Sequence, residues 1–331
     1  MNKLHFLLKN NKFFVCFLLN SEYTQLWSYK LIRKSNTHRA FTLVELLVVM
    51  SIIALLLGIL IPALGKARAA AILQKDATKM KKIHSAWIQW SADDDGRYPT
   101  PGLVNRLANS SGQHIKGVGP EDRLANTTDN LHSLAIMENL YKAEDLICDN
   151  EPNSNIYVFE SYDYDVRSVP DDIYWDEDLN VDMQEGGEGS NISYASIPLI
   201  GQRKIDEWKN SSSSNFPIIS NRGPEFGQPV KWSLTFDIHG GGRDWAGNIC
   251  WQDNHTSYEE TFLPTGSVYE TFEGKTNDNI FNIDCVTGIC NFWGGDTWLI
   301  QVSELTEVGT QFPYQLNPEL QWDPQIDDDA P

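Results

Sequence analysis

The sequence has few basic residues for its size and little that points to catalysis. Among 331 residues, 26 are Lys or Arg and 45 are Asp or Glu, so the formal net charge is −19. Such a chain repels phosphate groups, which argues against nucleic acid as a partner. No segment resembles a nucleophile elbow, a phosphate-binding loop or a zinc-protease helix. We therefore expect a protein that is not an enzyme and that needs no cofactor.

Cysteines are also scarce, and none of the five belongs to a Cys-x-x-Cys pair of the kind found in zinc sites. Cys16 lies near the start of the chain, and the other four form an even set, as is typical of an oxidising compartment. Three disulfide pairings are possible. The segment CVTGIC is typical of two strand ends around a tight Thr-Gly turn, so its own two cysteines are the first disulfide candidate. The disulfide candidates are Cys285, Cys290, Cys148 and Cys250.

Only one apolar run is long enough to cross a bilayer. Residues 41–64 read FTLVELLVVMSIIALLLGILIPAL and contain a single charged residue, Glu45. As a helix this segment is roughly 36 Å long, more than the ~30 Å hydrocarbon core of a membrane. A carboxylate inside such a span is costly, so its presence predicts that Glu45 has a function.

The residues around the start of this run resemble the leader of type IV prepilins and type II secretion pseudopilins. A short basic segment ends in a small residue, Ala40, and is followed by FTLVE. In that family a prepilin peptidase cuts at this point, and the new N-terminal residue, here Phe41, is methylated. Glu45 is the fifth residue and Pro62 the twenty-second after the cut, as in the family. Ala40 replaces the usual glycine, and we expect cleavage there; the alternative is an uncleaved signal anchor.

The resemblance implies a function in assembly. It predicts a structural subunit of a type II secretion or type IV pilus-like fibre, with prepilin peptidase, other pilin-like subunits and the bacterial inner membrane as partners. The N-terminus would be cytoplasmic and the C-terminal domain periplasmic or part of an extracytoplasmic fibre. Glu45 of one subunit would pair with the Phe41 amine of its neighbour.

Two other functions are compatible with the sequence. One is a membrane-tethered, extracytoplasmic protein that binds a ligand such as a carbohydrate, because aromatic residues with polar neighbours can stack on sugars. The other is a hydrolase. Alternatively, the same aromatic residues form the core of a β domain and bind no sugar. The tryptophans in question are Trp232, Trp245, Trp251, Trp293 and Trp298.

The expected fold class is α+β, with a long N-terminal helix packed on a mainly antiparallel β domain, as in pilins. Residues 1–40 form the leader, of which 1–30 are either a genuine extension or lie before the true start. The membrane and assembly helix covers 41–64 and its soluble continuation 65–92, where apolar residues recur at three- and four-residue steps. An extracytoplasmic domain covers 93–316, and an acidic, frayed tail covers 317–331.

Within that domain we expect a helix from Asp129, as N-cap, to about Tyr141. Short apolar runs between turn residues predict strands. The predicted strands are 156–160, 192–197, 216–220, 232–238, 248–252, 255–262, 268–273, 280–285, 289–293 and 297–303.

A weaker resemblance lies in the C-terminal half. The segment GNICWQDNH, after an earlier His-Gly-Gly, is similar to a His-x-Asp-Gly element of a pseudopilin-like group, with Asp253-Asn254 in place of Asp-Gly. Asn tolerates positive φ, so a hairpin turn is still expected. His239, Asp253 and His255 could together bind a metal, although a turn with local hydrogen bonds is the simpler interpretation.

The acidic turn that ends the long helix is the only other candidate for an ion. Asp93 and Asp95 belong to the run DDDGRYP, in which the acid-Gly pair and the proline predict a helix end and a turn. Adjacent carboxylates could bind calcium, but a complete calcium loop needs more oxygen ligands at alternating positions. We therefore favour a solvated turn here.

Overall fold

The computed structural model describes residues 42–326 with gaps at 114, 116, 167–173, 184–186, 272–273, 284, 287–288, 291–296 and 309–314. The leader and the predicted cleavage site at Ala40 and Phe41 therefore lie outside the described residues. The chain divides into two compact units, Met1–Ile59 and Leu60–Pro331.

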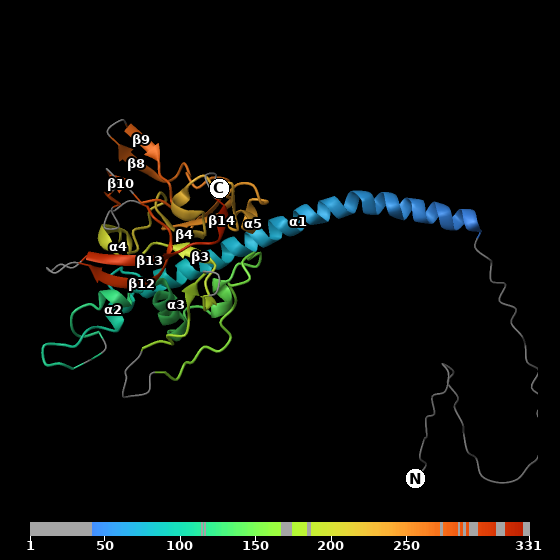
Figure 1. Cartoon of the computed structure of the whole chain (residues 1–331). Helices are drawn as coiled ribbons and strands as arrows, with labels where there is room; N and C mark the ends of the chain where they lie inside the picture. The colour runs from blue at the N-terminus through green and yellow to red at the C-terminus, as the bar shows by residue number, and fades with distance from the viewer. Residues whose placement is uncertain are drawn as a thin grey trace, which may run out of the picture. The chain divides into compact units, whose positions relative to one another are not determined.

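One helix, α1 (Leu43–Ser91), begins the described chain and is long and apolar enough to cross a membrane. Every residue from Thr42 to Ala71 is exposed, including the large apolar side chains of the predicted span. The helix continues through Pro62 without a break and ends where the predicted soluble continuation ends. The long helix expected from the sequence is thus confirmed (Figure 1).

The last turns of α1 are buried along one face, because apolar residues there recur at helical spacing. Met80, Ile83 and Trp87 are fully buried and belong to the main hydrophobic core. The Trp87 ring lies 4.9 Å from the ring of Trp208 and 6.3 Å from that of Tyr98. This face of the helix is therefore part of the domain core rather than a surface laid against it.

The largest sheet has four antiparallel strands in the order β3-β4-β6-β7. The remaining strands form antiparallel pairs, which confirms the predicted α+β class. The sheet strands are β3 (Tyr194–Ser196), β4 (Pro217–Asn221), β6 (Gly247–Trp251) and β7 (Thr256–Glu259). The paired strands are β1 (Val181–Asp182) with β2 (Gly189–Ser190), β5 (Trp232–Ser233) with β14 (Gln325–Ile326), β8 (Val268–Thr271) with β9 (Gly274–Asn277), β10 (Cys285–Val286) with β11 (Ile289–Cys290), and β12 (Gln301–Val308) with β13 (Gln315–Gln321).

Short helices connect these strands. The α-helices after α1 are α2 (Pro101–Val104), α3 (Thr128–Met137), α4 (Gly201–Glu207) and α5 (Phe236–His239). The 3-10 helices are η1 (Arg123–Ala125), η2 (Ala143–Leu146) and η3 (Glu225–Gly227).

Strand β6 and the turn after it dock on α1. Asn248 donates to the carbonyl oxygen of Leu73 at 3.0 Å, and Asn254 donates to Ser85 Oγ at 2.8 Å. Polar contacts at both ends of the strand thus fix its position along the helix, and apolar side chains of both elements belong to the main hydrophobic core.

Several predicted elements are wrong or shorter than expected. Helix α3 begins at Thr128 rather than after Asp129, since Thr127 is the last residue with an extended backbone. Residues 232–238 form β5 and then α5, because Ser233 Oγ accepts from the Thr235 amide and starts a turn. Residues 280–283 form no strand, since asparagine side chains bond the backbone there instead. Of the predicted strand 156–160, only Ile156 pairs, in a single bridge with Ser190.

The expected frayed tail is also wrong for residues 317–326, and residues 327–331 lie outside the described residues. Residues 315–321 form β13, which pairs with β12, and β14 pairs with β5. Apolar residues buried at this end, such as Leu316, belong to a second core cluster. The acidic composition of this segment suggested that it is exposed to solvent. Asp323 is nevertheless buried, and Arg222 neutralises it.

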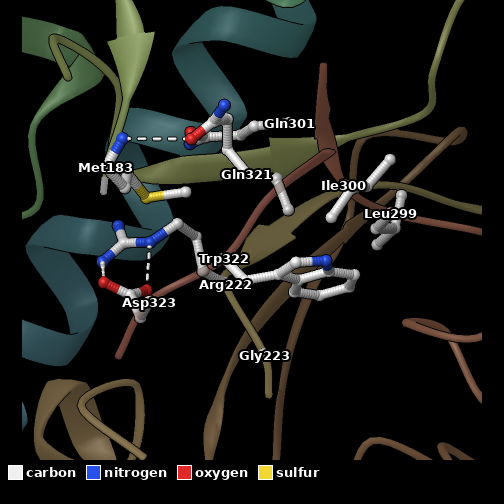
Figure 2. A pocket seen from close by; sticks show the side chains of 10 residues that line it. Met183, Arg222, Gly223, Leu299, Ile300, Gln301, Gln321, Trp322 and Asp323 are labelled. Carbon is white, nitrogen blue, oxygen red and sulfur yellow. Dashed lines mark hydrogen bonds and ion pairs between the residues drawn. The ribbon is translucent and has the colours of Figure 1, made fainter. Parts of the chain in front are cut away.

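Arg222 is the centre of a buried ion cluster. Its Nε lies 2.7 Å from Asp323 Oδ2, and its Nη1 lies 2.8 Å from Glu151 Oε2. Figure 2 shows the guanidinium facing Asp323; above it in this view, the Met183 amide donates to the Gln321 side chain at 3.2 Å. Arg222 therefore joins the end of the chain to the middle of the domain.

We predict that Arg222→Leu lowers the free energy of unfolding by about 3–5 kcal/mol, because two buried carboxylates lose their counter-ion. Urea unfolding of the detergent-solubilised chain measures this change. Arg97→Leu is the control. Arg97 pairs with Asp94 at 3.1 Å, but its side chain is 47% exposed, so we expect a loss below about 0.5 kcal/mol. Equal effects of the two substitutions would contradict this account.

Candidate functional site

Helix α1 begins with a reciprocal capping box. The Thr42 amide donates to Glu45 Oε2 at 2.9 Å, and the Glu45 amide donates to Thr42 Oγ1 at 3.2 Å. These bonds satisfy backbone donors that the first turn of a helix leaves without partners. Only one carboxylate oxygen is used, and Glu45 Oε1 has no hydrogen bond among the described residues.

Pro62 lies in the apolar part of α1. Its ring nitrogen carries no hydrogen, so the carbonyl oxygen of Gly58, four residues earlier, lacks its usual intrahelical partner. The helix at 58–62 is therefore held by fewer hydrogen bonds than its neighbouring turns.

A second carboxylate, Asp76, lies on the buried face of α1 and is fully buried. Its Oδ1 accepts from the Tyr194 hydroxyl at 2.7 Å. Its Oδ2 accepts from Asn221 and Asn248, each at 3.0 Å, and lies 3.1 Å from His239 Nε2. The carboxylate is thus held by donors from β3, β4, β6 and α5.

The balance of these contacts keeps Asp76 ionised. Burial alone would raise the pKa of this carboxyl, but the hydrogen bond and charge of His239, with hydrogen bonds from Tyr194 and Asn248, hold its pKa below the usual value. The thiol of Cys148 lies beside it. Burial, and then the Asp76 charge, raise the pKa of that thiol well above its ordinary range.

Asp76 was not among the residues singled out from the sequence, although a signal for it exists. It lies four residues after Ile72 and four before Met80, so it interrupts an apolar helical stripe. Glu45 was recognised by the same kind of pattern. An acid on an apolar face needs a partner wherever the face is buried.

The structure does not bring His239, Asp253 and His255 together as a metal site. His239 bonds Asp76, whereas the amide of His255 donates to Asp253 Oδ1 at 3.0 Å within an exposed turn. The His255 ring stacks on Trp251 at 5.5 Å. Within the described ranges, the only three-residue group with metal-binding geometry is Asp76, Cys148 and His239.

The expected hairpin turn at Asp253-Asn254 is confirmed. Asn254 has a φ of 67°, and the turn joins β6 to β7. The side-chain oxygen of Asn254 lies 3.3 Å from Nδ1 of His84, and Nε2 of His84 lies 3.1 Å from the Tyr98 hydroxyl. Burial lowers the pKa of His84 to about 4, so this histidine is a neutral core residue.

The acidic turn after α1 is a solvated turn, as favoured from the sequence. Asp93 and Asp95 are exposed, and the neighbouring Asp94 pairs with Arg97. Neither belongs to a group of potential metal ligands among the described residues.

Two of the four disulfide candidates carry free, buried thiols: Cys148 and Cys250. Burial raises the pKa of the Cys250 thiol to about 12, so it is not an activated nucleophile. Backbone pairing places Cys285 directly opposite Cys290, as the predicted hairpin requires. Their side chains lie outside the described residues, and that disulfide stays a prediction.

The tryptophans considered for sugar binding are mostly core residues. Trp245, Trp251 and Trp298 are each at most 2% exposed, Trp232 is partly buried, and Trp293 lies outside the described residues. No exposed aromatic platform forms from the buried three.

Comparison with known proteins identifies the start of the chain. A family model for the prokaryotic N-terminal methylation motif matches residues 35–61. This motif marks prepilin- and pseudopilin-type proteins, and with the apolar start of α1 it indicates membrane anchoring. It implies processing by prepilin peptidase and assembly with pilin-like subunits in general. No curated protein and no solved structure matches the chain, and the C-terminal resemblance gains no support.

We predict that Asp76→Ala lowers the free energy of unfolding by at least about 3 kcal/mol, because the buried donors of Tyr194, Asn221 and Asn248 each lose an acceptor. Urea unfolding measures the loss. The control is Asp93→Ala, which removes an exposed acid and should cost less than about 0.5 kcal/mol. An Asp76→Ala protein within about 1 kcal/mol of wild type would disprove the role of this carboxylate.

Proposed function

We propose that the chain is a structural subunit of a type II secretion or type IV pilus-like fibre. Prepilin peptidase would cut between Ala40 and Phe41, and the processed chain would polymerise through its N-terminal helix. The observation that carries this proposal is the methylation motif at 35–61, which runs directly into the exposed apolar start of α1.

The exposed apolar surface is compatible with membrane insertion and with assembly. A continuous apolar surface of this size needs either lipid or other apolar helices around it. Lipid and a bundle of identical helices are almost equally apolar, so a subunit can pass from one to the other at little hydrophobic cost. The apolar contacts alone therefore do not set the register between subunits.

Glu45 supplies that register in our proposal. The amine created at Phe41 is positive, and Glu45 of a neighbouring subunit is negative. Their pairing removes two charges from an apolar environment, where an unpaired charge costs several kcal/mol. Glu45 Oε2 is occupied by its own capping box, while Oε1 is available to a neighbour's amine. Capping and pairing can thus occur together.

The orientation follows from the same proposal. Prepilin peptidase acts at the cytoplasmic face, so the N-terminus would be cytoplasmic and the domain from residue 93 onward extracytoplasmic. Of the four cysteines outside the leader, Cys148 and Cys250 are free thiols, so only the predicted Cys285–Cys290 disulfide would suit an oxidising compartment.

The two other functions have less support. A tethered carbohydrate-binding protein would need exposed aromatic rings, but Trp245, Trp251 and Trp298 are buried. A hydrolase that uses His239, Asp253 and His255 would need all three residues close together, but His239 bonds Asp76 whereas Asp253 and His255 bond each other in an exposed turn.

We predict that Glu45→Gln inserts into the membrane normally but lowers fibre assembly at least about tenfold, since 1.4 kcal/mol already corresponds to that factor and a buried unpaired amine costs more. Glutamine can still complete the capping box, so helix initiation is kept. Crosslinking in cells followed by membrane fractionation measures both properties.

Thr42→Ala is the matched control, because it removes the threonine part of the capping box and leaves the Glu45 charge in place. We expect near-normal assembly from this variant. Normal fibres from both Glu45→Gln and Glu45→Ala would disprove the pairing, and failure of Thr42→Ala alone would assign the effect to helix capping.

A further inference from the structure

The cluster around Asp76 contains three residues able to bind a metal, each from a different segment. Asp76 lies on α1, Cys148 follows η2, and His239 ends α5. One ligand atom from each lies within 4.8 Å of the others. Fibre assembly through the N-terminal helix makes no use of this group.

We propose that Asp76, Cys148 and His239 form a zinc site, with solvent as the fourth ligand. Thiolate and imidazole ligands favour Zn²⁺ over calcium or magnesium, which prefer oxygen ligands alone. Three protein ligands from Cys, His and Asp, with one open position, are a coordination pattern that Zn²⁺ adopts.

The surroundings orient the ligands before any metal binds. Tyr194, Asn221 and Asn248 hold the Asp76 carboxylate through hydrogen bonds of 2.7–3.0 Å. Such outer contacts raise metal affinity because they fix the direction of a ligating oxygen. The segment of Cys148 is fixed as well, because Lys79 of α1 donates to the carbonyl oxygen of Ile147 at 2.7 Å.

One of the three ligands borders open space. His239 lines a cavity of about 350 Å³ together with Leu73, Asn150 and Tyr258. It also lines a second cavity of about 440 Å³ that includes Trp245 and Glu260. Asp76 and Cys148 are buried and line neither cavity, so an ion would enter along His239.

Binding exchanges protons for the metal. The Cys148 thiol releases its proton to solvent, and His239 Nε2 loses the hydrogen that it donates to Asp76. The sulfur, Nε2 and a carboxylate oxygen then each bind Zn²⁺, and the hydrogen bond between His239 and Asp76 is replaced by one bond from each residue to the ion. No electron is transferred. Since the three ligands come from α1 and two domain segments, the ion would join the long helix to the domain independently of fibre assembly.

Cobalt(II) provides the test, because a thiolate bound to it gives a charge-transfer absorption band that zinc lacks. The detergent-solubilised full chain is stripped of metal and titrated with Co²⁺, and Zn²⁺ is then added. We expect one equivalent to produce the band, Zn²⁺ to abolish it, and Zn²⁺ to raise the unfolding temperature. Absence of a saturable thiolate band in the wild-type chain would overturn the proposal.

Variants assign the ligands. Cys148→Ser should lose the band, and His239→Gln should weaken cobalt binding at least about tenfold, as loss of a ligand does. Cys250→Ser is the matched control, because Cys250 is also a buried free thiol and its Sγ lies 3.8 Å from His84 Nδ1. It should keep the band. A band that survives Cys148→Ser, or that disappears only with Cys250→Ser, would place the metal elsewhere and overturn the assignment.

Discussion

The structure depends on how the carboxylates on the apolar faces of α1 are neutralised. Asp76 lies on the buried face and is satisfied within the chain by Tyr194, Asn221, Asn248 and His239. Glu45 lies on an exposed apolar segment and is only half satisfied, by Thr42. A carboxylate in an apolar environment needs a partner. Asp76 therefore orders the domain around the helix, whereas in our proposal the second oxygen of Glu45 pairs with the amine of a neighbouring subunit.

Buried carboxylates elsewhere in the domain are also neutralised by partners within the chain. Arg222 neutralises Glu151 and Asp323, so acids far apart in the sequence meet at one buried cation. The strongly acidic chain can bury these groups because each has a counter-charge or several hydrogen-bond donors. The end of the chain is held in the fold in this way, and its strands complete the second core cluster.

The sequence predicted the features that depend on local pattern. The long helix, its buried stripe at Met80, Ile83 and Trp87, and the Asn254 turn follow from periodicity and turn chemistry. It did not predict the Asp76 cluster, because that cluster joins Asp76 to residues far away in the sequence, from Cys148 to Asn248. The same reason explains the misplaced tail, since Asp323 looks solvent-exposed until its pairing with Arg222 is known. Of the three residues considered for a metal site, Asp253 and His255 do contact each other in a turn with local hydrogen bonds, the interpretation favoured from the sequence. His239 lies apart from them because its partner is Asp76, far away in the sequence.

The most direct test of the account is the N-terminal residue of the protein purified from membranes, identified by mass spectrometry. The account predicts a mature chain that begins with N-methylated Phe41. A chain that retains an intact leader across Ala40 would contradict it, because Glu45 would then have no free amine to pair with in a neighbouring subunit.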